Sequence, residues 1–249
     1  MVLVVFTAIT SCVTREKPLA TLTPVITATL PRDSTTFTQG LFFHKGLLYE
    51  SHGLYGRSGL MIIDAKNGST MKRIECAPDM FAEGCTEFNG ALVQLTWREQ
   101  TAYVYGLPDL DKRNTLTYAG EGWGLTSDGV RFYMSDGTDT VTVRNKEFTI
   151  TRRMAVRANG MPVSKLNELE WATGKLYANI WYSDRIAEID PKSGRVLRFI
   201  DCSELIRREN PGSPDYVLNG IAFDPATGVF YLTGKKWKNC YLVRLKSSR

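Results

Sequence analysis

The chain of 249 residues is predicted to be all-β, a five-bladed β-propeller with one short helix inserted before the last blade. The first observation behind this prediction is an internal repeat of about 44 residues. The repeating unit begins at Gly40, Gly84, Gly124, Glu168 and Gly220, at intervals of 44, 40, 44 and 52 residues. Five β-rich copies of a unit this long are typical of five four-stranded blades around a central channel.

The second observation is that each unit has the pattern of strands joined by tight turns. A strand-like run, a turn containing Gly and an aromatic-rich second strand occupy residues 40–49, 84–93, 124–133, 168–177 and 220–231. A third strand ending in a turn is plainest at residues 60–68 and 186–194, which end in Asn-Gly and Ser-Gly. Gly and Asn tolerate positive φ, so these dipeptides indicate hairpins. The alternation and the Tyr, Val, Ile and Thr content disfavour a helical repeat.

Two segments lie outside the repeat. Residues 203–210 have helical spacing, and an inserted helix there accounts for the long last interval. Residues 21–30 form a spare strand upstream of the first unit. We expect this strand to pair with the C-terminal blade and close the ring, because an open ring would expose unpaired strand edges.

Composition excludes several classes of protein. Hydrophobic residues make up 43% of the chain and charged residues 23%, and mean hydropathy is −0.20. This balance rules out a disordered, collagen-like or polytopic membrane chain. The net charge of +5 comes from scattered basic residues, so nucleic-acid binding is disfavoured. The only histidines are His44 and His52, which excludes a zinc site with three His ligands.

The N-terminus is predicted to carry an export signal. Residues 1–11 contain no charged side chain, and the apolar run among them has the size of a signal-peptide core. Residues 9–12 resemble the lipobox of bacterial lipoproteins, in which Cys12 would become the lipidated N-terminus. This interpretation gives a signal segment at 1–12, a tether at 13–22 and a propeller domain at 23–249, exported and lipid-anchored on the periplasmic side of a bacterial membrane. The alternative is a buried first strand with an incidental cysteine.

Four further cysteines lie in the predicted domain, at positions 76, 85, 202 and 240. An even number in an exported protein is compatible with two disulfides, but free buried thiols fit the sequence equally well. Since no Cys-x-x-Cys is present, a structural zinc site and a thioredoxin-like motif are both disfavoured.

Aligning the repeats predicts a pocket at one end of the channel. One set of equivalent positions stands just before each unit: Gln39, Glu83, Trp123, Asn167 and Asn219. A second set follows each second strand: residues 50–52, Trp97, Ser135 with Asp136, Trp181 and Lys235. Together they would form a pocket with aromatic walls, carboxylates and a lysine. The alternative is an ordinary polar, water-filled channel with tryptophans in blade packing.

Several motifs then resemble one known family. FTQGL at 37–41, YESHGLYGRS at 49–58, GWGLT at 122–126, LNELE at 166–170, ANIW at 178–181, LNGIA at 218–222 and TGK at 233–235 are similar to plant-type glutaminyl-peptide cyclotransferases. The resemblance runs from about residue 37 to residue 245. It implies a five-bladed propeller that converts the N-terminal Gln of peptides or proteins to pyroglutamate and releases ammonia.

The resemblance also implies a set of site residues. Substrate would be bound by Phe37, Gln39, Phe81, Trp97, Trp123 and Trp181, with Glu83, Asn167 and Lys235 as catalytic groups. The chemistry suggests Glu83 as a proton shuttle, with the amide oxygen stabilised by Lys235, or by Asn167 and a tryptophan N–H. The adjacent Lys236 leaves open which lysine enters the pocket. No cofactor is required and no metal ligand is assigned, although a structural calcium is compatible with the sequence. The expected partners are peptides with an N-terminal Gln, and the protein is expected to be a monomer that meets a membrane only through its anchor.

Two other functions remain open at this point. A non-catalytic, ligand-binding propeller lipoprotein would explain the same aromatic channel. A propeller hydrolase of the lactonase type would use a calcium ion, for which Glu83, Asn167 and Asn219 are candidate ligands. The scarcity of histidine disfavours the zinc-dependent, animal-type route to pyroglutamate, which needs a His ligand.

Overall fold

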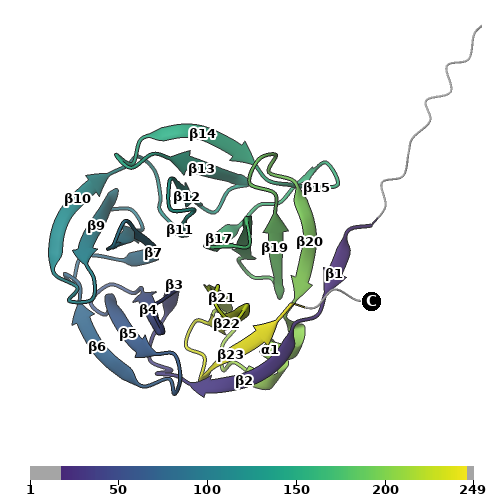
Figure 1. The fold of residues 1–249 in the computed structure, drawn as a ribbon, viewed down its shortest axis with the longest axis horizontal. Coiled ribbons are helices and arrows are strands. Elements are labelled where there is room, and N and C mark those ends of the chain that lie inside the picture. The colour runs from purple at the N-terminus through teal and green to yellow at the C-terminus, as the bar shows by residue number, and fades with distance from the viewer. Residues whose placement is uncertain (1–17, 246–249) are drawn as a thin grey trace, which may run out of the picture.

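The computed structural model describes residues 18–245, which form five β-sheets arranged as blades around a central axis (Figure 1). Blade one consists of β3 (Thr38–His44), β4 (Leu47–His52), β5 (Gly59–Asp64) and β6 (Thr70–Glu75). Blade two consists of β7 (Ala82–Phe88), β8 (Ala91–Thr96), β9 (Thr101–Gly106) and β10 (Lys112–Thr117). Blade three consists of β11 (Leu125–Ser127), β12 (Phe132–Met134), β13 (Thr140–Arg144) and β14 (Ile150–Ala155). A small hairpin, β15 (Arg157–Ala158) and β16 (Met161–Pro162), follows blade three.

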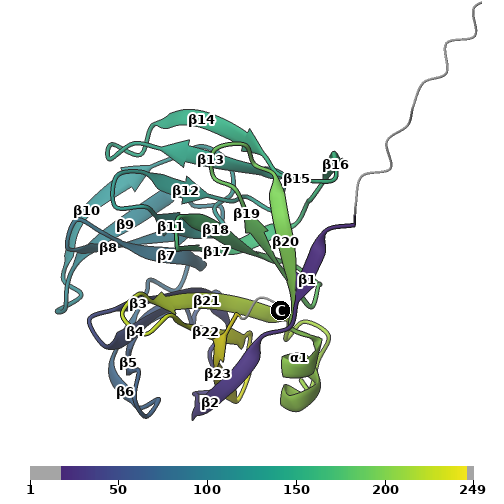
Figure 2. The same ribbon diagram turned by 45° about the vertical axis from the view of Figure 1, so that its right-hand side comes forward.

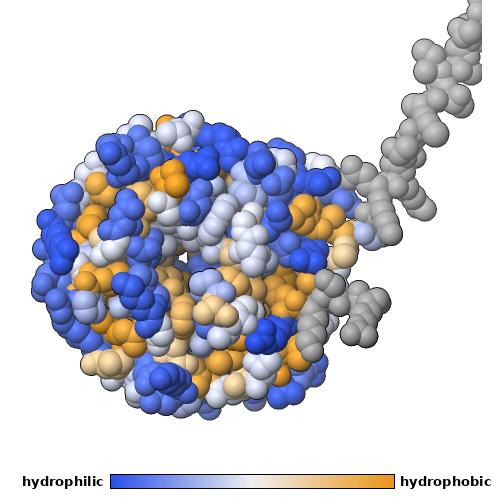
Figure 3. All heavy atoms as spheres, viewed as in Figure 1, coloured by the Kyte–Doolittle hydropathy of each residue, from blue (hydrophilic) through white to orange (hydrophobic). Residues whose placement is uncertain are grey.

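Blades four and five complete the ring. Blade four consists of β17 (Leu166–Ala172), β18 (Lys175–Ile180), β19 (Arg185–Ile189) and β20 (Val196–Asp201). Blade five consists of β21 (Leu218–Asp224), β22 (Val229–Gly234), β23 (Asn239–Arg244) and β2 (Val25–Pro31). The inner strand of every blade is the one that begins a predicted repeat unit, so the prediction of a five-bladed propeller is confirmed. The face viewed in Figure 3 is hollowed at the centre of the ring.

The hydrophobic core is divided among the spaces between neighbouring blades. Each of the five apolar clusters draws its buried side chains mainly from two adjacent sheets. Between blades one and two, for example, Leu60 of β5 and Leu92 of β8 belong to the same cluster and are fully buried. Packing of this kind, sheet face against sheet face, fixes the rotation from one blade to the next.

The N-terminal segment closes the ring. Strand β2 pairs antiparallel with β23 and forms the outer edge of blade five, as expected for the spare strand (Figure 1). The end of the predicted tether at 13–22 overlaps strand β1 (Ala20–Leu22), which pairs in parallel with β20 as a fifth strand of blade four. Figure 2 shows β1 and β2 running past both blades in succession. The pairing satisfies the outer edge of β20, and Leu22 is buried.

The predicted helix is confirmed as α1 (Ser203–Glu209), between β20 and β21. It ends at Asn210, whose left-handed backbone (φ 46°) is a common helix terminator. The Glu209 carboxylate accepts hydrogen bonds from the Lys238 backbone N–H and from Nδ2 of Asn239 at 3.0 Å. The helix is therefore anchored to the last blade, and the chain that follows it is led back toward the channel.

Several predictions about the N-terminus lie beyond the described residues. The signal segment at 1–12 and the lipidation site at Cys12 fall outside residues 18–245, so they stay predictions. Within the described range, no helix is long and apolar enough to cross a bilayer. The four described cysteines, 76, 85, 202 and 240, are all free thiols.

Candidate active site

A repeated irregularity in the inner strands aims polar side chains at the channel. In blades one, two, four and five the pairing register between the inner strand and its neighbour shifts by one residue near the start of the inner strand. The affected segments contain Gln39, Glu83, Asn167 and Asn219. An extra residue in one strand re-aims its side chains, and three of these four positions, Gln39, Glu83 and Asn167, line a pocket at the end of the channel.

Glycines that follow Gln39 and Trp123, two members of the first set of equivalent positions, bring the inner strands close together. A Cβ on Gly40 would lie 2.4 Å from the backbone N of Cys85, and a Cβ on Gly124 would lie 2.0 Å from the carbonyl oxygen of Asn167. In blade four this place is taken by the buried Glu168, whose carboxylate accepts the backbone N–H groups of Leu41 at 3.3 Å and Ile221 at 2.9 Å. The carboxylate therefore ties blade four to blades one and five near the axis.

The pocket at this end of the channel has a volume of about 440 Å³. Its lining includes all nine residues that the sequence assigned to substrate binding and catalysis: Phe37, Gln39, Phe81, Glu83, Trp97, Trp123, Asn167, Trp181 and Lys235. A volume of this size suits a side chain with its flanking backbone groups.

Glu83 is the buried carboxylate of the pocket lining. Its side chain is buried and accepts a hydrogen bond from Nε2 of Gln39 at 3.2 Å. Burial raises the pKa of Glu83 well above its ordinary range; the positive charge of Lys235 opposes this shift, and the negative charges of Glu121 and Glu99 add to it. Glu83 therefore holds a proton more readily than an exposed glutamate, and a shifted carboxyl group in a pocket is a candidate acid–base group.

Lys235 is the lysine that enters the pocket. Its Nζ lies 4.6 Å from the centroid of the Phe37 ring, and the residue is buried. Burial lowers the pKa of Lys235 to about 8, although the negative charges of Glu83 and Asp215 act to raise it. Lys236 also lines the pocket, but it is only partly buried and its Nζ lies over the ring of Tyr216, at 5.3 Å from the centroid.

Aromatic rings form the pocket walls in edge-to-face pairs. The Phe81 and Trp97 centroids are 5.5 Å apart, and those of Trp123 and Trp181 are 5.4 Å apart. Glu121 fixes two of these rings, because its Oε2 accepts the indole N–H of Trp97 at 2.8 Å and that of Trp123 at 3.1 Å. These two N–H groups are engaged by Glu121 and are therefore not free to bind a substrate oxygen.

Comparisons with known proteins show the family of this chain. A family model described as glutamine cyclotransferase matches residues 1–245. The chain belongs to the glutamine cyclotransferase family. A glutaminyl-peptide cyclotransferase of Arabidopsis thaliana is 36% identical over 229 residues, which is 90% of this chain and 71% of the relative. The crystal structure of Myxococcus xanthus glutaminyl cyclase matches with a TM-score of 0.87 and 34% identity, covering 94% of this chain and 100% of that one.

Membership of the glutamine cyclotransferase family confirms the resemblance seen in the sequence. The pocket itself differs from the prediction, because part of the predicted second set of positions does not line it. The Glu50 carboxylate instead forms an ion pair with Arg32 at 2.6 Å. Ser135 donates a hydrogen bond to the Asn167 carbonyl oxygen at 2.6 Å, so it supports the site from behind. Neither His52 nor Asp136 is among the lining residues.

The structure adds lining residues that the repeat did not indicate: Leu54, Tyr182, Asp215, Tyr216 and Lys236. Tyr182 donates its hydroxyl hydrogen to Oδ1 of Asp215 at 2.6 Å, joining blade four to the segment after α1. The proximity of Tyr182 and Lys236 to predicted site residues was an available signal for those two. No signal marked Asp215 and Tyr216, because the inserted segment has no equivalent in the other units. Within residues 18–245 no group of three or more His, Cys, Asp and Glu side chains could hold a metal ion.

Proposed function

We propose that this protein converts the N-terminal Gln of peptides or proteins to pyroglutamate and releases ammonia. The observation that carries the proposal is a single buried carboxylate, Glu83, in an aromatic pocket that also contains Lys235. The names of the family and of its relatives support the same activity.

The reaction needs no nucleophile from the enzyme. The α-amine nitrogen of the substrate attacks the carbonyl carbon of its own γ-carboxamide, and a C–N bond closes the five-membered ring. The C–NH₂ bond then breaks once the leaving nitrogen is protonated, and ammonia departs. Both reacting groups belong to one residue, so the pocket accelerates the step by holding the amine against the carboxamide.

Glu83 would move the proton between the two nitrogens. The substrate amine attacks in its neutral form, after its ammonium proton has been lost to water. As a carboxylate, Glu83 accepts the further proton that the attacking nitrogen sheds as the C–N bond forms, and as a carboxylic acid it passes that proton to the leaving nitrogen. Burial raises the pKa of Glu83, which makes its carboxylate a stronger proton acceptor than that of an exposed glutamate.

Negative charge develops on the amide oxygen as the ring closes. Lys235 is placed to stabilise this oxygen, since its charged side chain lies in the same pocket as Glu83. Asn167 lines the pocket, and its Oδ1 is buried without a hydrogen-bond partner among the described residues, so this atom can accept an N–H of the substrate. The aromatic walls would exclude water that could otherwise hydrolyse the amide.

The direct test is mass spectrometry of a Gln-initiated peptide incubated with the protein. We expect loss of ammonia from this peptide and none from the same peptide with an acetylated N-terminus, because the acetylated nitrogen cannot attack. A Gln-initiated peptide that stays intact, or that gains water by hydrolysis, would contradict the proposal.

The lowered pKa of Lys235 predicts how kcat depends on pH. Lys235 is charged below its pKa of about 8, so kcat is expected to fall as the pH rises above about 8 and the charge is lost. Lys235→Met should lower kcat by about 10²-fold and remove this alkaline decline, since an oxyanion-stabilising group of this kind contributes about 10²–10³-fold. A wild-type profile that stays flat to pH 10, or a decline that persists in Lys235→Met, would exclude Lys235 from this role.

A further inference from the structure

Asn219 is the one member of the first set of equivalent positions that does not line the pocket. The other four members, Gln39, Glu83, Trp123 and Asn167, all do. Asn219 lies on β21 of blade five, next to blade one, and is fully buried. Because Asn219 is buried and does not line the pocket, it can affect the site only through the residues that it contacts.

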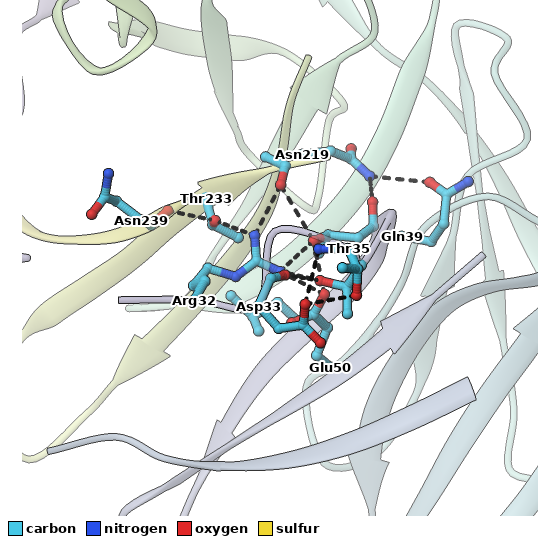
Figure 4. Close-up of polar contacts among 12 residues, drawn as sticks. Arg32, Asp33, Thr35, Gln39, Glu50, Asn219, Thr233 and Asn239 are labelled. Carbon is cyan, nitrogen blue, oxygen red and sulfur yellow. Dashed lines mark hydrogen bonds and ion pairs between the residues drawn. The ribbon is translucent and has the colours of Figure 1, made fainter. Parts of the chain in front are cut away.

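The Asn219 carboxamide contacts Gln39. Its Nδ2 donates to the carbonyl oxygen of Thr38 at 2.9 Å and to Oε1 of Gln39 at 3.3 Å. Figure 4 shows Asn219 directed at Oε1 of Gln39, with Nε2 of Gln39 on the far side. That Nε2 donates to Oε1 of Glu83 at 3.2 Å. A chain of hydrogen bonds therefore runs from blade five, through Gln39 of blade one, to Glu83 of blade two.

The direction of this chain depends on Asn219. A glutamine carboxamide can turn by half a rotation, exchanging its oxygen for its NH₂ group. With Nδ2 of Asn219 donating to Oε1 of Gln39, the NH₂ group must face Glu83. In the reversed orientation the Gln39 oxygen would face the Glu83 carboxylate and the NH₂ group would face an amide donor, so both contacts would be repulsive.

We propose that Asn219 is a positioning residue, which locks the Gln39 carboxamide so that its NH₂ group faces Glu83 and the substrate. This inference rests on the proposed function, because it assigns Gln39 and Glu83 to the same reaction. Asn219 acts only through Gln39. A matched residue is available in Asn179, which is also fully buried, and whose Oδ1 accepts the backbone N–H of Gly220 at 2.9 Å.

A double-mutant cycle tests the proposal. Asn219→Ala is expected to lower kcat by about 10-fold, the usual consequence of losing a buried hydrogen bond, with a smaller change in KM. In a Gln39→Ala background the same substitution should change kcat by less than about twofold, since the group it positions is absent. Equal losses in both backgrounds would overturn the proposal, as would a Gln39→Ala variant with normal kcat.

The control substitution is Asn179→Ala. It removes a buried asparagine that bonds the same strand but has no contact with Gln39, so its effect on kcat should be the same with and without Gln39. If Asn219→Ala does not fold, Asn219→Ser provides a smaller change whose hydroxyl is too short to reach Gln39. If the cycle for Asn179 shows the same coupling as that for Asn219, the proposal fails.

A titration independent of turnover separates this inference from the proposed function. The charged groups that act on Glu83 are Lys235, Glu121 and Glu99, and none of them is altered in Asn219→Ala. Losing an oriented N–H donor disfavours the carboxylate, so the ¹³C-detected carboxyl titration of Glu83 should move to higher pH in Asn219→Ala and stay unchanged in Asn179→Ala. An unmoved titration in Asn219→Ala would overturn the inference. If the wild type converts no Gln-initiated peptide, the proposed function fails, and this titration still decides the contact.

Discussion

Glu83→Gln is expected to lower kcat for a Gln-initiated peptide by about 10³-fold, within the range of about 10²–10⁴-fold that general acid–base groups contribute. The amide has the shape of the carboxylate but cannot accept a proton from the attacking nitrogen or pass one to the leaving nitrogen. Ammonia release, followed in a coupled assay, measures the loss. Retention of more than about a third of wild-type turnover would remove Glu83 from the mechanism.

The fold should survive this substitution. Glu83 is buried and its carboxylate is disfavoured by burial, so a neutral amide in its place carries no charge to desolvate. The matched control is Glu170→Gln, which changes another buried carboxylate, one that accepts the backbone N–H of Phe223 at 2.8 Å outside the pocket. This variant is expected to keep its turnover. If both variants lose activity equally, the loss reflects damage to the channel rather than proton transfer.

The site could be predicted from sequence to the extent that it obeys the repeat. The bulge in four of the five inner strands places Gln39, Glu83 and Asn167 at equivalent points, so alignment of the units was enough to bring them to one end of the channel. The same symmetry predicted a fifth polar position, Asn219, but not that it stands behind Gln39. A repeat predicts that residues are equivalent, but it does not predict their side-chain rotamers or neighbours. These decide which member of the first set of equivalent positions lines the pocket.

Features without an equivalent in other blades could not be predicted. Asp215 reaches the pocket because α1 is anchored through Glu209 to the last blade, a contact between segments that only the folded chain brings together. Glu121 lies two residues before Trp123, but its second indole partner, Trp97, is on another strand connection. Similarly, Glu50 belongs to the second set of equivalent positions, but its carboxylate forms an ion pair with Arg32, an arginine outside every repeat unit.

That arginine, Arg32, follows the closing strand β2 and provides the second large expected effect. Its Nη2 forms the ion pair with Glu50 at 2.6 Å and donates to Oγ1 of Thr38 at 2.7 Å, while Nη1 donates to Oγ1 of Thr233 at 2.7 Å. Figure 4 shows the Arg32 guanidinium group with its contacts to Glu50 and Thr233. The group therefore joins the closing segment to β3 and β4 of blade one and to β22 of blade five. Its side chain is only 5% exposed.

Arg32→Met is expected to lower the free energy of unfolding by about 3–5 kcal/mol, because it leaves the buried Glu50 carboxylate without its counter-charge. Urea denaturation of the wild-type protein and of the variant measures this difference in the free energy of unfolding. Adding Glu50→Met should recover much of it, since removing both charges leaves no ion to desolvate. The control is Arg207→Met: Arg207 is 72% exposed in its ion pair with Glu204, and exposed pairs contribute about 0–1 kcal/mol. If Arg32→Met costs no more than this control, the buried ion pair adds nothing to the closure of the ring, which then depends on strand pairing and on packing between blades.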